Sequence, residues 1–131
     1  MEEMKMEHQI AYKIIPLESY PRLKHFEYFK DMANPYVGVT VKVDISEFLT
    51  IIRDKKLPFF LSFLYCVSNA ANSVAELRQR IYKGSIIEYQ GCPISHRVAL
   101  ENDTYCYCKL DSNLAFDAYL PYALQIQERA K

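Results

Sequence analysis

Residues 58–81 of this chain read PFFLSFLYCVSNAANSVAELRQRI, and the rest of the sequence is arranged around this stretch. Its apolar residues recur at steps of three and four, which places them on one face of a helix; they are Phe60, Phe63, Val67, Ala70, Val74 and Leu77. Pro58 suits a first helical turn, because the amide that it lacks would be unpaired there. Asn72 and Ser73 weaken the helix, and residues 78–82 are more typical of a strand. We therefore expect a helix over about residues 58–72 with this stripe in the core, and a strand from about residue 77.

The N-terminal flank predicts a strand, a helix, a second strand and a second helix. Residues 10–17 alternate in polarity until Pro16, and residues 23–32 repeat apolar side chains every three positions. Residues 36–43 alternate valines with other residues, which is the clearest strand pattern in the chain. Asp44, with Glu47 three residues later, begins the best-marked helix as a capping box.

The C-terminal flank predicts two hairpins and a last helix. Residues 77–82 and 86–89 enclose a glycine turn, and residues 94–100 and 105–110 enclose a polar tip. The last helix is expected over about residues 114–129, where Pro121 should kink it or start it afresh. The order β α β α α β β β β α predicts an α/β fold of mixed α+β layers. We expect a loose leader over residues 1–9 and a single domain over residues 10–131.

Composition excludes several classes of protein. The 131 residues include sixteen basic and sixteen acidic side chains, so no net charge favours nucleic acid as a partner. The longest nearly unbroken apolar run, residues 57–67, is too short to span a bilayer. The first ten residues do not resemble a secretory signal, and four cysteines without such a signal are typical of reduced thiols. We therefore expect a cytoplasmic protein with neither a nucleic-acid nor a membrane partner.

The residues alone give no catalytic constellation. Cys106 and Cys108 share one face of a predicted strand, with Cys92 and His96 upstream, but an i, i+2 pair is poorly suited to one tetrahedral ion. We expect reduced cysteines that pack as small hydrophobes, and no metal site. His8, His25 and His96 are each expected to be structural or solvent-exposed rather than a general base.

Several stretches taken in order resemble the chloramphenicol acetyltransferase family. They are Arg22-x-x-His25-Phe26-Glu27-Tyr28-Phe29, Val43-Asp44-Ile45-Ser46, Pro58-Phe59-Phe60, and Ala75-Glu76-Leu77-Arg78 running into Ile81-x-x-Gly84-x-Ile86. The resemblance covers nearly all of this chain and about the first three-fifths of a family member. It implies the N-terminal portion of the family's two-layer sandwich, with acetyl-CoA as co-substrate and no bound cofactor.

The resemblance also implies what the sequence lacks. Family enzymes are trimers with active sites between subunits, where a histidine deprotonates the drug's hydroxyl and the hydroxyl attacks the thioester. That histidine belongs to a late His-His-x-x-x-Asp-Gly motif, and a serine that steadies the oxyanion also comes late. Neither occurs in these 131 residues, so no catalytic residue carries over. We expect a chain that is truncated at its C-terminal end and inactive alone.

The opposite wall of the acceptor site does carry over from the resemblance. Its four residues are Tyr28, Phe29, Val37 and Cys106. Cys106 stands where the family has a phenylalanine, and Arg97 replaces a smaller polar residue nearby; both departures weigh against chloramphenicol itself. Arg22 matches an arginine that pairs with the aspartate of the missing motif, and that partner does not occur here. As alternatives, Tyr28 and Phe29 are core aromatics of an amphipathic helix, and Arg22 is a solvated first-turn residue.

Three hypotheses for function follow. The first is the N-terminal portion of an acyltransferase that acts on a small hydroxyl-bearing acceptor, completed by a homo-oligomer, a trimer by resemblance, or by a missing C-terminal segment. The second is a non-catalytic binding or interaction module derived from that family. The third is a small metal protein that uses Cys92, Cys106 and Cys108.

Overall fold

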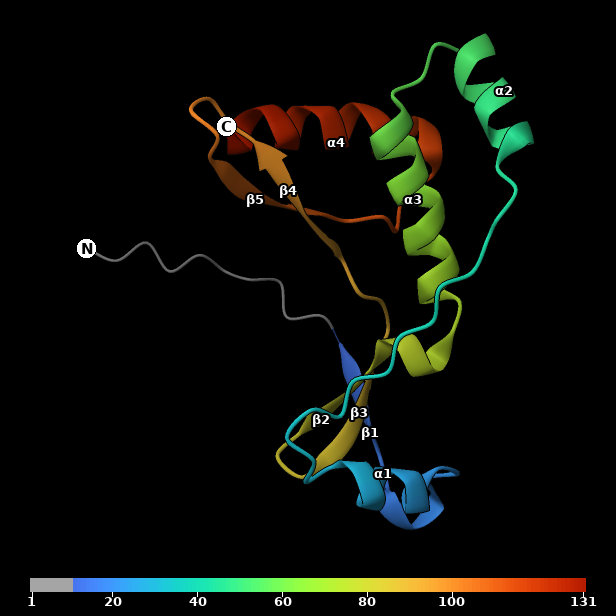
Figure 1. The fold of residues 1–131 in the computed structure, drawn as a ribbon, viewed down its shortest axis with the longest axis vertical. Coiled ribbons are helices and arrows are strands. Elements are labelled where there is room, and N and C mark those ends of the chain that lie inside the picture. Colours follow the sequence, from blue (N-terminus) through green and yellow to red (C-terminus); the bar gives the residue numbers. More distant parts are fainter. Residues whose placement is uncertain (1–10) are drawn as a thin grey trace.

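The computed structural model describes residues 11–131, so the predictions for the leader, His8 and Ile10 lie outside the described residues. The elements in chain order are β1 Tyr12–Ile15, η1 Leu17–Ser19, α1 Leu23–Phe29, α2 Ser46–Asp54, α3 Phe59–Asn72, η2 Ala75–Arg78, β2 Gln79–Tyr82, β3 Ser85–Tyr89, β4 Ile94–Ala99, β5 Tyr105–Leu110 and α4 Phe116–Ala130 (Figure 1). The mixture of helices and sheets confirms the α/β class. None of the helices in residues 11–131 is long and apolar enough to cross a bilayer.

Strands β1, β3 and β2 form an antiparallel sheet in that order. The β2–β3 hairpin turns at Lys83 and Gly84, which both have positive φ, 48° and 76°. Two consecutive left-handed residues make the turn whose twist matches that of the flanking strands, and glycine adopts this conformation at no steric cost. The hairpin predicted around this glycine is therefore confirmed.

Strands β4 and β5 form a second antiparallel sheet of two strands. In its register, Ile94 lies opposite Leu110 and Val98 lies opposite Cys106. Burial alternates along both strands, so one face is packed and the other exposed. The second predicted hairpin, with its polar tip, is confirmed.

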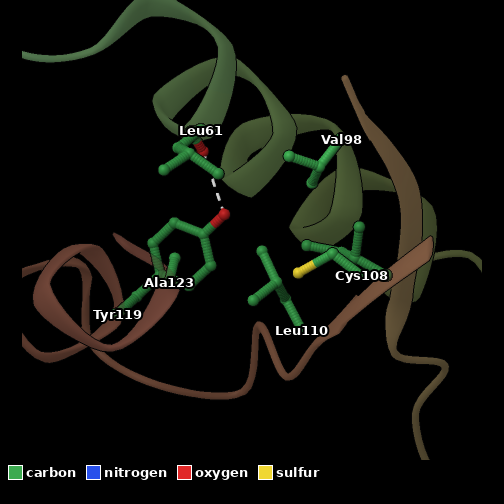
Figure 2. Packing of buried hydrophobic residues seen from close by; sticks show 7 residues of the cluster. Leu61, Val98, Cys108, Leu110, Tyr119 and Ala123 are labelled. Atoms are coloured by element: carbon green, nitrogen blue, oxygen red, sulfur yellow. Dashed lines mark hydrogen bonds between the residues drawn. The ribbon is translucent and has the colours of Figure 1, made fainter. Parts of the chain in front are cut away.

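The core lies where α3 and α4 pack against the β4–β5 sheet (Figure 2). Its fully buried members come from all four elements: Leu61, Ile94, Val98, Cys108, Leu110, Tyr119 and Ala123. The Tyr119 hydroxyl donates a hydrogen bond to the Leu61 carbonyl at 3.0 Å, which joins α4 to α3 inside the apolar cluster. Helix α4 is one helix that continues through Pro121, so the predicted alternative of a helix that starts afresh there does not occur.

Helix α3 forms where it was predicted, but the predicted buried face is wrong. All six residues of the stripe through Phe63 and Val67 are exposed, whereas Leu61, Ser62 and Ser68 are buried. The physical reason is that α3 is apolar around most of its circumference, so periodicity allows two faces. The β4–β5 sheet and α4 pack on the Leu61 side. Of the stripe, the residues nearest its N-terminal end have ring contacts: Phe60 with His96 of β4, and Phe63 with Phe48 of α2.

The strand predicted over residues 36–43 is also wrong. Residues 34–45 form neither helix nor strand and belong to neither described sheet, and the four valines are 71–93% exposed. Alternation shows that a segment could serve as a strand, whereas a strand exists only where a second strand accepts its hydrogen bonds. Helix α2 then begins at Ser46, and the Asp44 carboxylate accepts the Ser46 amide at 2.9 Å. The reciprocal bond of a capping box from Glu47 is not found among the described residues.

Candidate active-site wall

Tyr28 and Phe29 lie together at the C-terminal end of α1. Their rings make an edge-to-face pair with centroids 4.9 Å apart, and the residues are 68% and 45% exposed. Helix α1 buries none of its residues fully. The alternative that these are core aromatics is therefore wrong, and the pair presents an apolar surface to the outside.

A hollow of about 510 Å³ lies beside this pair, between α1 and the β2–β3 hairpin. Its lining combines aromatic rings with charged groups: Tyr20, Arg22, His25, Phe26, Phe29, Pro35, Glu76, Gln79, Arg80, Ile81 and Ile86. Phe29 belongs to this lining. The size suits a small molecule, and the mixture of apolar surface with a few polar groups is typical of ligand sites.

Arg22 holds one edge of the hollow through an ion pair that the sequence did not indicate. Its guanidinium donates to the Glu76 carboxylate at 3.0 Å and lies 5.6 Å from the centroid of the Tyr20 ring. Hydrogen bonding to Tyr20 and then to Glu76 raises the pKa of Arg22. The pKa of Glu76 is lowered by its own backbone amide and then by Arg22. Both groups therefore stay charged at neutral pH, and Arg22 is a half-exposed member of a pair rather than a freely solvated residue.

Cys106 lies away from the aromatic pair, half-buried on β5 against the core cluster. Val37 is 93% exposed on the segment between α1 and α2. Helix α1 and strand β5 lie at opposite ends of the molecule (Figure 1). One chain thus brings together Tyr28 and Phe29, with Arg22 nearby, but not the four predicted wall residues.

Neither described histidine has the surroundings of a general base. His25 is exposed and lines the hollow, and it makes no hydrogen bond within residues 11–131. His96 is buried on β4, with Nε2 3.4 Å from the Gln127 side-chain oxygen and its ring 5.3 Å from that of Phe60. No ion pair joins either ring to a carboxylate of the described chain. Both residues are placed as the sequence predicted, one outside and one in a structural position.

No disulfide joins the four cysteines, and all four are free thiols. Cys108 is buried in the core, where desolvation, followed by the neighbouring Cys106, raises the pKa of its thiol. This confirms Cys108 as a small hydrophobe, whereas Cys66 is exposed. Residues 11–131 contain no group of three or more ligand-type side chains that could hold a metal ion, so Cys92, Cys106 and Cys108 form no such centre.

A second hollow, of about 650 Å³, lies at the C-terminal end of α3 and was missed by the sequence. Ser112, which lines this hollow, shares a buried hydrogen bond of 2.6 Å with Ser68. The Asn72 side chain donates to the Cys92 carbonyl at 3.0 Å and accepts the Cys92 amide at 2.7 Å. The only signal in the sequence was the cluster of Asn and Ser at the end of α3, which indicated the helix end but not the network.

Comparison with known proteins supplies the remaining facts. A family model described as chloramphenicol acetyltransferase matches residues 10–128. A chloramphenicol acetyltransferase from Proteus mirabilis is 27% identical over 79 residues, which cover 60% of this chain and 36% of the relative. One from Escherichia coli is 28% identical over 83 residues, covering 63% and 38%. A solved chloramphenicol acetyltransferase superposes with a TM-score of 0.82 at 26% identity, covering 90% of this chain and 56% of its own. The chain thus spans well under two thirds of the length of these relatives.

Proposed function

Since this chain belongs to the chloramphenicol acetyltransferase family, we propose that it supplies the acceptor-binding wall of an acyltransferase. The observation that carries the proposal is the exposed Tyr28–Phe29 pair beside the 510 Å³ hollow. An exposed edge-to-face pair offers apolar contact to a ring or aliphatic group of an acceptor. The charged Arg22–Glu76 pair at the same hollow would orient a polar group of that acceptor.

The reaction is the transfer of an acetyl group from the acetyl-CoA thioester to a hydroxyl of a small acceptor. The hydroxyl oxygen attacks the thioester carbonyl, its proton passes to a base, and coenzyme A leaves as the thiol. The base must lie within hydrogen-bond reach of the hydroxyl, and donors must face the developing oxyanion. Neither His25 nor His96 has such an arrangement. We therefore assign the base to another chain or segment, and expect no turnover by these 131 residues alone.

The arrangement of the wall residues favours a site that is shared. Cys106 on β5 lies far from Tyr28 on α1 within one chain, as an active site between subunits would allow. A homo-oligomer, threefold by the family resemblance, or a further polypeptide segment would complete the site. The four free thiols suit a reducing compartment, and we place the protein in the cytoplasm.

The alternative function is a binding module that uses the same wall without chemistry. It is favoured by the absence of a placed base among the described residues. Both functions require Tyr28 and Phe29 to contact a ligand, and they differ in whether acetyl-CoA is consumed once the site is complete.

The test has a binding arm and a turnover arm, with chloramphenicol as the probe. Tyr28→Ala should weaken binding by about two- to tenfold, since an aromatic contact contributes about 0.5–1.5 kcal/mol. Tyr107→Ala is the matched control, because Tyr107 is equally exposed but lies on β5. Equal effects of the two substitutions would show that the pair is not the wall.

In the turnover arm, purified chain with acetyl-CoA and chloramphenicol should release no coenzyme A above background. His25→Ala and His96→Ala are assayed beside it. Turnover that is lost with either alanine would contradict the proposal and would place the base on this chain.

A further inference from the structure

A series of side-chain hydrogen bonds leads from the three-stranded sheet to the edge of the 510 Å³ hollow. Tyr20 and Gln79 both line that hollow, and the Tyr20 hydroxyl donates to Gln79 Oε1 at 3.3 Å. Gln79 Nε2 in turn donates to Glu88 Oε2, on β3, at 3.1 Å. The three residues, all half-buried, form what we call the relay.

The direction of each hydrogen bond in the relay is set by the charge at its inner end. Glu88 Oε1 lies 3.3 Å from the Lys13 ammonium and 3.6 Å from the Arg78 guanidinium, and the Glu88 side chain is only 12% exposed. Hydrogen bonds from Gln79 and then from Lys13 outweigh burial and lower the pKa of Glu88, which therefore stays ionised at neutral pH. An ionised carboxylate only accepts hydrogen bonds, so the Gln79 amide must turn its nitrogen to Glu88 and its oxygen to Tyr20.

The consequence at the hollow is that the single proton of the Tyr20 hydroxyl is already in use. A phenol has one proton to donate, and its oxygen can also accept. Because Gln79 takes that proton, the Tyr20 oxygen can only accept a hydrogen bond from a ligand. Arg22 also interacts with this hydroxyl, but a guanidinium only donates, so it does not change the direction of the Tyr20 proton. A ligand group that reaches the Tyr20 oxygen must therefore carry a proton of its own.

We propose that Glu88 is a positioning residue, which acts through Gln79 to keep Tyr20 a hydrogen-bond acceptor, and that the hollow therefore takes small molecules that present a free hydroxyl to Tyr20. An ether or ester oxygen at the same place would face an oxygen with no proton between them. The inference rests on the proposed function, because it names the hydrogen-bonding class of the molecule that the same hollow takes.

Glu88→Gln reverses the relay with one substitution. The new amide keeps its oxygen toward Lys13 and Arg78, because both groups only donate, and presents its nitrogen to Gln79. Gln79 must then turn its oxygen inward and its nitrogen to Tyr20. The Tyr20 oxygen accepts from Gln79, and its proton becomes free to face the hollow. The double variant Glu88→Gln with Gln79→Glu restores the original direction at unchanged net charge, because a carboxylate at position 79 accepts from both neighbours.

The readout is the ratio of dissociation constants for two probes, chloramphenicol and the ether in which its hydroxyls are methylated. A variant that merely loses stability weakens both probes and leaves their ratio unchanged. The preference of wild type for the hydroxyl probe should fall by about two- to tenfold in Glu88→Gln, the effect of one hydrogen bond, and return in the double variant. Tyr20→Phe should show the same fall, with no further response to Glu88→Gln.

A measurement without ligand follows the relay itself, by NMR of the chain with isotope-labelled glutamine. The Gln79 side-chain amide faces Glu88 in wild type and Tyr20 in Glu88→Gln. Tyr20→Phe should therefore shift the Gln79 amide protons more in the Glu88→Gln background than in the wild-type background. The Gln79 signal is assigned by its loss in Gln79→Ala. Equal shifts in both backgrounds would overturn the relay.

The outcomes separate this inference from the proposed function. An equal probe ratio in wild type, Glu88→Gln and Tyr20→Phe, with binding that Tyr28→Ala weakens, would overturn the inference and leave the proposed function standing. A relay that reverses in the spectra, in a chain whose probe binding does not depend on Tyr28, would contradict the proposed function and the ligand class with it.

Discussion

Tyr119 offers a sharp test of how the core is built, because its hydroxyl is both a structural donor and a titratable group. The ring has no exposed surface, and the hydroxyl donates to the Leu61 carbonyl at 3.0 Å. Tyr119→Phe removes the donor and keeps the ring, so it should lower the free energy of unfolding at pH 7 by about 1 kcal/mol, the net contribution of one hydrogen bond.

Alkaline pH should reverse this order of stability. Burial first, and Cys108 next, raise the pKa of Tyr119 to about 12 from its ordinary value of about 10. The folded state therefore holds this proton while the unfolded state releases it, and stability falls as pH rises from about 10 to about 12. At 1.36 kcal/mol per pKa unit, the loss is about 2 kcal/mol at pH 12 and approaches about 3 kcal/mol only at higher pH. Since Tyr119→Phe lacks this loss, the two stabilities should cross at about pH 11.

The assay is urea unfolding of both chains at closely spaced pH values from 7 to 11.5. The other ten tyrosines are common to both chains, so the difference between the two curves isolates Tyr119. Parallel curves would refute the reasoning, because they would show that the hydroxyl is already accessible to water in the folded state.

Two further substitutions test the packing of α3 and its connection to the sheet. Leu61→Ala leaves a cavity in the core, so it should lower the free energy of unfolding in urea by about 2–5 kcal/mol. Val67 is 47% exposed outside that core, so Val67→Ala should change the same free energy by no more than about 0.5 kcal/mol. Equal costs would show that both faces are covered in solution. Arg78 donates from Nε to the Asn72 carbonyl at 2.9 Å and from a terminal nitrogen to the Tyr89 carbonyl at 2.6 Å. Arg78→Lys keeps the charge but cannot make both bonds, so it should lower the free energy of unfolding by about 1–2 kcal/mol. An unchanged midpoint would mean that water replaces these bonds without loss.

Local structure was predictable from the sequence wherever a few neighbouring residues decide it. The turn at Lys83 and Gly84 and the polar tip between β4 and β5 are examples, since each depends on residues next to it. The family, too, followed from ordered short stretches. Partners remote in sequence were not predictable: the stripe through Phe63 and the strand over residues 36–43 have the right patterns, but a pattern does not say which element will cover it.

In the candidate site, too, the individual residues were predictable from the sequence, whereas their contacts with residues remote in sequence were not. Tyr28 and Phe29 were found by resemblance, and their exposure fits a wall. The pairing of Arg22 with Glu76 joins residues 54 positions apart, so no local signal could indicate it. The network of Asn72 with the β3–β4 connection was likewise invisible, because an asparagine at a helix end is usually a stop signal.

Strand β1 has a consequence for the order of folding. Its register joins Ile15 to Ile86, about seventy residues away, whereas the β2–β3 hairpin closes across only two residues. Closing the longer loop costs about 3 kcal/mol more in chain entropy, so it should follow rather than precede formation of the hairpin. In a pulse-labelling experiment, amides of β3 that face β2 should gain protection before those that face β1. Strand β1 would then be the last of the three strands to join the sheet, after β2 and β3 have paired.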